Sequence, residues 1–125
     1  MVNKIAKITI YVNNQDEAVN FWVEKMKFRK VFDQEIGSGI RWIEVAFSQD
    51  YETNIILYSK DTMKHVDPTM LAHPAMMFGT NDIEKTYQEL KDNNVKVDGM
   101  IQMPYGMVFP FYDQDGNTFL VTENK

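Results

Sequence analysis

The chain has 125 residues, a net charge of −5 and no cysteine. This length suits a single domain, and a content of 44% hydrophobic and 25% charged residues is ordinary for a globular protein. Without cysteine, disulfides, thiolate catalysis and cysteine-ligated metal sites are excluded, and a cytoplasmic location is expected. The negative charge argues against nucleic acid and anionic membranes as partners. No apolar run approaches the roughly 18 residues that a membrane helix needs.

The first half of the chain predicts a strand, a helix and three further strands. β-branched and aromatic residues in partial alternation predict a strand over residues 4–12, and Asn13-Asn14 offers a cap for a following helix. The apolar face of that helix recurs at spacings of three and four: Ala18, Phe21, Trp22 and Met26. Three segments then carry strand signals, the first two joined by a tight turn at Gly37-Ser38-Gly39: residues 28–36, 40–48 and 53–59.

The same order of elements is predicted again after an irregular segment. Residues 60–74 lack periodicity and read as a linker, with a short helical turn around residues 69–72. The later segments then repeat the pattern of strand, helix and strands: a strand over residues 75–80, a helix capped by Asn81-Asp82 with Ile83, Tyr87 and Leu90 on its apolar face, an extended stretch from Val95, and strands over 105–112 and 117–123.

The two halves match best at a separation of roughly 68 residues, which sets Val12 over Thr80. We therefore expect an α+β fold of two βαβββ modules within a single domain over residues 1–125. The first module covers about residues 1–59 and the second about 75–125, joined by the linker of residues 60–74. Residue identity between the halves is low, so the repeat rests on pattern.

Three short motifs make the pattern more specific. They are Ile8-Thr9-Ile10-Tyr11-Val12-Asn13 with Phe21-Trp22, then Asn81-Asp82-Ile83-Glu84 with Tyr87, and finally Asp113-Gln114-Asp115-Gly116-Asn117. In this order and spacing they resemble the vicinal oxygen chelate superfamily, which holds glyoxalases, bleomycin resistance proteins and extradiol dioxygenases. The resemblance covers nearly the whole chain and implies that each module is a curled mixed sheet forming half of a cup.

The resemblance also implies where a metal ion would bind, and these positions carry unsuitable residues. The histidine expected in the opening strand falls on Lys7, its counterpart in the second module on Ala75, and the glutamate of the final strand on Leu120. Neither an ammonium nor an aliphatic side chain is an ordinary ligand for a divalent ion. Glu44 is the nearest carboxylate to the remaining position, so no metal site is predicted.

A divalent-metal-dependent lyase, isomerase or dioxygenase stays open as the alternative. It would need Glu44 together with His65 or His73, both in the predicted linker, to hold zinc, nickel or manganese. These histidines are more simply surface residues of a loop. Whether a reaction is catalysed is left open.

Strand alternation predicts which side chains face the cup. In the opening strand Lys7, Thr9 and Tyr11 face it, while Ile8, Ile10 and Val12 turn toward the helices. The candidate ligand-binding residues are Lys7, Thr9, Tyr11, Trp42, Glu44, Tyr58, Met77, Tyr105 and Leu120. An ammonium buried without a partner is costly, so Lys7 should meet Glu44, another carboxylate or an anionic ligand. Filling of the core or of a dimer contact is the competing role for the aromatic rings.

These residues favour a protein that binds a small planar or anionic organic molecule in a metal-free cup, in the manner of bleomycin-type antibiotic binding proteins. An interaction protein whose cup is filled by its own side chains is a further alternative. The resemblance implies a homodimer, because members of this length pair to complete their cups, and open sheet edges need covering.

Overall fold

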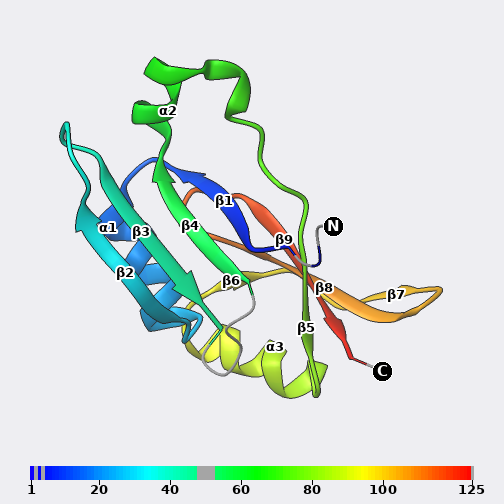
Figure 1. Cartoon of the computed structure of the whole chain (residues 1–125). Coiled ribbons are helices and arrows are strands. Elements are labelled where there is room, and N and C mark those ends of the chain that lie inside the picture. Colours follow the sequence, from blue (N-terminus) through cyan, green and yellow to red (C-terminus); the bar gives the residue numbers. More distant parts are fainter. Residues whose placement is uncertain (2, 4, 48–52, 125) are drawn as a thin grey trace. The chain divides into compact units, whose positions relative to one another are not determined.

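The structure is a computed structural model that describes residues 1, 3, 5–47 and 53–124. The chain divides into two compact units, Met1–Pro74 and Ala75–Lys125 (Figure 1). Two predicted strand ends, at residues 4 and 48, lie outside the described residues.

The first unit is built on one mixed sheet of strands in the order β1-β4-β3-β2 (Figure 1). Its strands are β1 (Lys7–Val12), β2 (Arg29–Glu35), β3 (Arg41–Ala46) and β4 (Asn54–Ser59). β1 runs parallel to β4, whereas β2 and β4 run antiparallel to β3. The parallel pair brings the amino-terminal strand beside the fourth strand rather than beside its neighbour in sequence.

The second unit repeats this plan. Its strands are β5 (Met77–Thr80), β6 (Lys96–Val97), β7 (Ile101–Met103), β8 (Gly106–Tyr112) and β9 (Thr118–Glu123). Their order is β5-β9-β8-β6, with β7 also paired to β8, and β5 is parallel to β9. The α+β class with two mixed sheets is therefore confirmed. The predicted offset is confirmed at the strand ends, since β1 ends at Val12 and β5 at Thr80.

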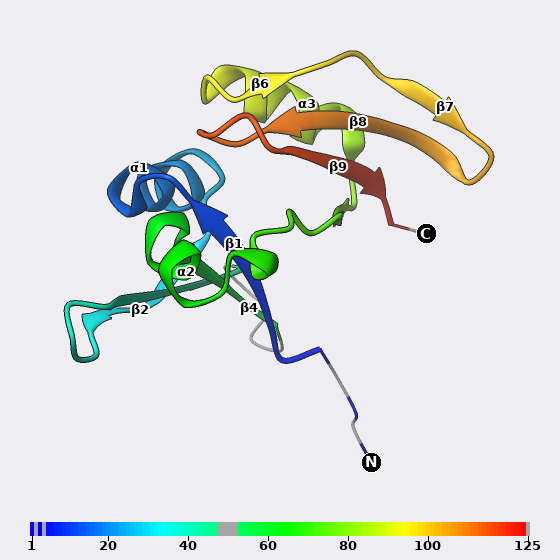
Figure 2. The same cartoon turned by 90° about the horizontal axis from the view of Figure 1, so that it is seen from above.

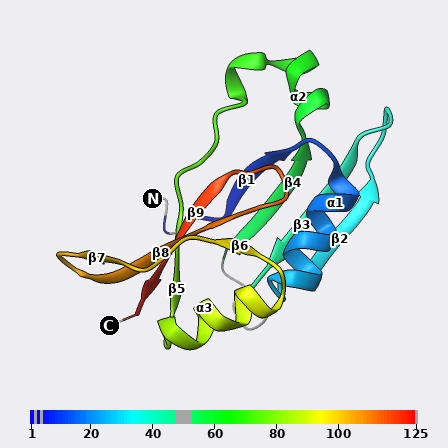
Figure 3. The same cartoon turned by 180° about the vertical axis from the view of Figure 1, so that it is seen from behind.

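A helix covers one face of the first sheet (Figure 3). It starts as α1 (Gln15–Val19) and continues as a π-helix, η1 (Asn20–Lys25), with Met26 N donating to Phe21 O at 3.0 Å. Asn14 caps α1, as the sequence predicts, because its side chain accepts from Glu17 N. The wider π winding was not predicted; it occurs where Phe21 and Trp22 are both buried, and one extra residue per turn changes which side chains point inward.

The predicted linker is more ordered than expected. The prediction that residues 60–74 form an irregular segment is wrong for their first half, which is helical. α2 (Lys60–Val66) follows β4 directly, and a short 3₁₀ helix, η2 (Pro68–Met70), comes next. No residue of α2 is buried, so the helix leaves no apolar periodicity in the sequence. Its signal is the cap, because Ser59 Oγ accepts from Thr62 N at 3.1 Å.

In the second unit α3 (Ile83–Asp92) packs against β6, β8 and β9 (Figure 2). The predicted cap is confirmed, since the Asp82 side chain accepts from Lys85 N, and Ile83 and Leu90 are buried on the predicted face. No helix in the described part of the chain is long and apolar enough to span a bilayer.

Burial alternates along β1 and β9 as the sequence predicts, whereas β3 and β4 each bury four consecutive residues, Ile43–Ala46 and Ile55–Tyr58. In β1 Ile10 and Val12 are 0% exposed, and in β9 Phe119 and Val121 are 1% and 3% exposed. Each sheet thus buries one set of side chains in its own core. The other set of the first sheet, which includes Lys7, Tyr11 and Glu44, is available for a site.

Candidate functional site

An ion pair joins the two charged residues that the sequence singles out in the first unit. Lys7 Nζ lies 2.7 Å from Glu44 Oε2, and the side chains are 48% and 9% exposed respectively. Lys7 begins β1 and Glu44 lies on β3, so the pair bridges over β4, which runs between these strands. The prediction that Lys7 meets Glu44 is confirmed.

Glu44 is held by two further donors besides the ammonium. Trp42 Nε1 donates to Glu44 Oε2 at 2.8 Å, and Asn54 Nδ2 donates to Glu44 Oε1 at 2.9 Å. Burial raises the pKa of the Glu44 carboxyl, but the hydrogen bonds from Lys7, Trp42 and Asn54 outweigh burial and leave the pKa below its ordinary value. The carboxylate is therefore ionised at neutral pH and keeps a fixed orientation.

Aromatic rings form a row beside this ion pair. The Tyr11 and Tyr58 ring centroids are 6.3 Å apart, and those of Trp42 and Tyr58 are 5.7 Å apart, both edge to face. The row runs across three strands, because Tyr11 pairs with Tyr58 between β1 and β4. Three of the predicted aromatic residues thus lie together, and Thr9, paired with Ile56, lies on the same face of β1.

A pocket of about 400 Å³ opens over the outer half of this face. Its lining combines two predicted residues of β3 with three that were not predicted: Trp42 and Glu44, then Val31, Phe32 and Ile36. A β-bulge explains the contribution of β2. Lys30 pairs with Val45 and Phe32 with Glu44, so Val31 is an extra residue. Strict alternation would separate Val31 from Phe32, whereas the bulge lets both line the pocket, and no pattern of the sequence indicates a bulge.

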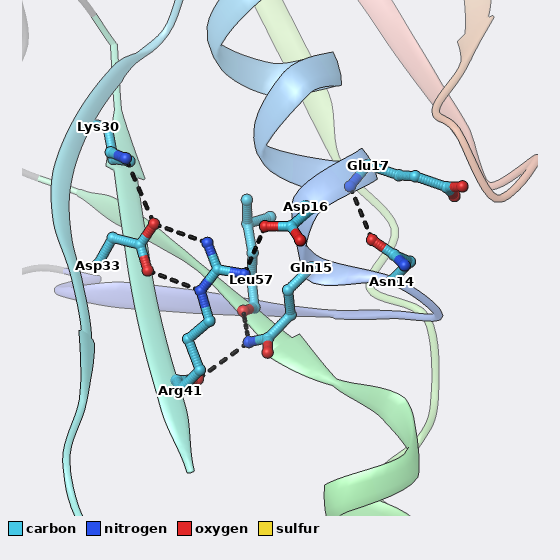
Figure 4. Close-up of polar contacts among 8 residues, drawn as sticks. All are labelled: Asn14, Gln15, Asp16, Glu17, Lys30, Asp33, Arg41 and Leu57. Carbon is cyan, nitrogen blue, oxygen red and sulfur yellow. Dashed lines mark hydrogen bonds and ion pairs between the residues drawn. The ribbon is translucent and has the colours of Figure 1, made fainter. Parts of the chain in front are cut away.

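A polar network on the opposite face fixes the strands that carry the pocket (Figure 4). Arg41 Nε and Nη2 each lie 2.8 Å from an oxygen of Asp33, and Nη1 lies 2.6 Å from Asp16 Oδ1 on α1. The bond from Arg41 holds the pKa of Asp33 below its ordinary value. Gln15 Nε2 donates to the carbonyl oxygens of Arg41 and Leu57, both at 2.9 Å. The network ties the start of α1 to three strands.

The remaining candidate residues belong to the second unit. Met77 and Leu120 are paired in register between β5 and β9, and Met77 is 46% exposed. Tyr105 lies apart from them, at the turn between β7 and β8. There it lines a pocket of about 260 Å³ with Gly106, Met107, Glu123 and Asn124. Within this unit the structure brings Met77 and Leu120 together but not Tyr105.

The residues at the implied metal positions do not fit a divalent ion. At the first position Lys7 presents an ammonium, which is not a metal ligand. This ammonium donates to Glu44 Oε2, and the Glu44 carboxylate accepts three hydrogen bonds in all. His65 belongs to α2, not to a loop, and its exposed ring contacts Asp61 O through Nδ1 at 2.8 Å. Across residues 1, 3, 5–47 and 53–124, no three His, Asp or Glu side chains gather into a group that could hold a metal ion.

Comparisons with known proteins agree with this architecture. The model of the Glyoxalase/Bleomycin resistance protein/Dioxygenase superfamily matches residues 4–121. The protein YetH of Bacillus subtilis (strain 168) is 35% identical over 124 residues, which are 98% of this chain and 100% of YetH.

Two solved structures are also similar. One is TnmS3, an antibiotic binding protein from Streptomyces sp. CB03234, with 26% identity, a TM-score of 0.82 and coverage of 99% of this chain and 98% of TnmS3. The other is a superfamily member from Sphaerobacter thermophilus DSM 20745, with 26% identity, a TM-score of 0.83 and coverage of 98% of each chain. This chain therefore belongs to the Glyoxalase/Bleomycin resistance protein/Dioxygenase superfamily.

Proposed function

We propose that this protein binds a small planar or anionic organic molecule on the exposed face of the first sheet, without a metal ion. The observation that carries the proposal is the Lys7–Glu44 pair beside an apolar pocket. Where a metal-dependent relative would present ligands to an ion, this chain presents an ammonium already bound to a carboxylate. Such a site can orient a molecule by hydrogen bonds and ring contacts, and its ammonium stands where a ligand would be needed to hold a metal ion that polarises a substrate oxygen.

The pocket has the composition of a small-molecule site. It combines apolar side chains from β2 with one indole and one carboxylate from β3. Pockets of this size, mostly apolar with few fixed polar groups, are typical of sites for small organic ligands. The similarity to TnmS3, an antibiotic binding protein, favours sequestration of an antibiotic or a similar compound as the biological role.

A ligand screen by thermal shift tests the proposal. Flat aromatic compounds and, as a separate class, antibiotics of the bleomycin type are each added with a chelator and, separately, with zinc, nickel or manganese. A ligand at 100 times its Kd adds about 2.7 kcal/mol to the free energy of unfolding, which raises Tm by several degrees. We expect a compound that raises Tm equally with and without the metal ions.

Two matched variants locate the binding. Ile36 lines the pocket and is 55% exposed, whereas Ile101 lies on β7 and is 46% exposed. Ile36→Asp should abolish the Tm increase and Ile101→Asp should keep it. A compound that binds only with a stoichiometric metal ion would instead support the metal-dependent lyase, isomerase or dioxygenase, and so would zinc, nickel, manganese or iron found in protein purified without a histidine tag.

The protein is further proposed to act as a homodimer in the cytoplasm. β1 and β2 are the edges of the first sheet, and Val31, Phe32 and Ile36 expose apolar surface at the β2 edge. Exposed apolar strand edges favour pairing with another surface. The location rests on composition, since a chain without cysteine is compatible with a reducing compartment.

A further inference from the structure

The Glu44 carboxylate and the Lys7 ammonium differ in how many of their hydrogen-bonding positions are filled. Glu44 is 7% exposed and receives donors from Lys7, Trp42 and Asn54. The ammonium of Lys7 carries three N–H donors, and Glu44 is its one recorded partner in the described part of the chain. With 48% of its side chain exposed, Lys7 can donate to an added molecule without leaving Glu44. A ligand therefore gains most here by supplying an acceptor.

The charge of the site argues against a charged acceptor. Glu44 is the charged residue among the described residues that line the pocket, and the Lys7 ammonium 2.7 Å away balances it. A ligand anion that approaches the ammonium also approaches the Glu44 carboxylate, so attraction and repulsion nearly cancel while the anion still loses its hydration. An uncharged oxygen accepts the same hydrogen bond at a smaller desolvation cost.

The apolar walls define the rest of the ligand. Val31 and Phe32, brought together by the β-bulge, line the pocket from β2, and Trp42 lines it from β3. Aromatic and aliphatic surfaces facing a pocket of about 400 Å³ suit a flat fused-ring system of two or three rings.

We propose that the ligand is an uncharged, flat ring system bearing a carbonyl oxygen, such as a lactone, ketone or quinone, and that Lys7 donates the hydrogen bond that selects it. This inference rests on the proposed function and narrows its ligand class. Glu44 acts as the positioning residue, because it lines the pocket, holds the ammonium of Lys7 2.7 Å from its Oε2 and neutralises the charge of that ammonium.

Three probes of nearly equal size separate the possibilities: coumarin, which has a carbonyl acceptor; naphthalene, which has none; and 2-naphthoate, which is an anion. Binding is followed by NMR through the indole N–H signals. The chain has two tryptophans, so the signal of Trp42 is assigned with Trp42→Phe, and buried Trp22 serves as the internal reference. A hydrogen bond from a charged donor should make coumarin bind about tenfold more tightly than naphthalene. 2-Naphthoate should bind more weakly than coumarin.

Substitutions assign the preference to the ammonium. In Lys7→Met/Glu44→Gln, which removes both charges together, coumarin should lose its preference and bind about as tightly as naphthalene binds to the same variant. Lys7→Arg should restore most of the preference. Equal affinity of coumarin and naphthalene for the unmodified protein would overturn the inference while the pocket stands, and so would tightest binding by 2-naphthoate. If no probe shifts the Trp42 signal, the proposed function itself fails at this site. These comparisons need only the unmodified protein, so they hold even if the double variant does not fold.

Discussion

Glu44 is the residue on which the geometry of the site depends. Its carboxylate gathers donors from β1, β3 and β4, so that one buried group links three strands. Removing the carboxylate takes the acceptor from Trp42 and Asn54, which are partly buried, and this costs more than the hydrogen bond alone contributes. Glu44 therefore influences both the fold and any ligand that contacts Lys7.

The lowered pKa of Glu44 predicts a loss of stability in acid. Because the pKa is lower in the folded state than the ordinary value of about 4.3, the carboxylate stabilises the fold above that value, and this contribution disappears as the pH falls through the folded pKa. Urea unfolding should show Glu44→Gln to be less stable than the unmodified protein by about 1–3 kcal/mol at pH 7. The difference should shrink in acid, as the pH falls through the lowered pKa of the Glu44 carboxyl and the unmodified protein loses this contribution.

Glu89→Gln provides the control, since Glu89 is exposed on α3. Its effect should stay within about 0.5 kcal/mol both at pH 7 and in acid. A difference for Glu44→Gln that is equally large in acid would mean that its cost arises from packing and not from ionisation.

The positions of Lys7 and Glu44 could be predicted from the sequence, whereas the residues around them could not. Alternation along β1 and β3 was enough to place Lys7 and Glu44 on one face, because period-two patterning survives wherever the other face is buried. Val31 and Phe32 could not be predicted as pocket residues, since a bulge arises from strand pairing that a single sequence does not record. Asn54, which completes the bonds to Glu44, carried no signal beyond its position at the start of β4.

At the scale of elements, directional hydrogen bonds and an ion pair fix the junction between α1 and the first sheet. Gln15 donates to carbonyl oxygens of β3 and β4 from the first position of the helix. Arg41 and Asp16 join the same turn to β3 by an ion pair. Apolar packing alone would let the helix slide along the sheet, whereas these directional bonds fix where it begins.

Gln15→Ala should therefore destabilise the protein by about 1–3 kcal/mol, because two strand carbonyls lose their donor. Urea unfolding measures the loss, and Glu17→Ala on the same helical turn should cost less than about 0.5 kcal/mol, as its exposed side chain lies away from the sheet. Equal losses for the two variants would show that helix propensity, not the anchoring bonds, dominates at this turn.

Two features of the helices escaped prediction, the existence of α2 and the π winding of η1. α2 buries none of its residues, so it produces no apolar stripe, whereas the 3₁₀ helix Pro68–Met70 overlaps the helical turn predicted around residues 69–72. The π-helix has the composition of an α-helix, and it occurs where the rings of Phe21, Trp22 and Phe28 pack edge to face. Hydrophobic periodicity predicts helices and strands that bury one face in a core. It does not predict a helix such as α2, which buries no side chain.

At the scale of the whole molecule, the repeat is the strongest result of the sequence. The two units have low residue identity but share one sheet order. In each unit a helix packs against the sheet, and the first strand pairs in parallel with the last strand of that unit. The family follows from this architecture. The ligand does not, since one fold serves many chemistries.

The proposed homodimer gives a measurable mass. Light scattering at micromolar concentration should report twice the 14.6 kDa of one chain. The apolar edge of β2 is the surface that pairing would cover, so a charged residue there should shift the equilibrium toward single chains. A mass of one chain across the micromolar range would contradict the dimer and leave the binding proposal to stand on the pocket alone.

The pairing of β1 with β4 and of β5 with β9 also bears on how the protein is made. A ribosome extends the chain from the amino terminus, so β1 cannot pair fully with β4 until residue 59 has emerged. The first sheet can then close while the second is still being translated, and we expect nascent chains to gain protease resistance in two steps, one for each sheet. Each step is gated by synthesis of a sheet's final strand.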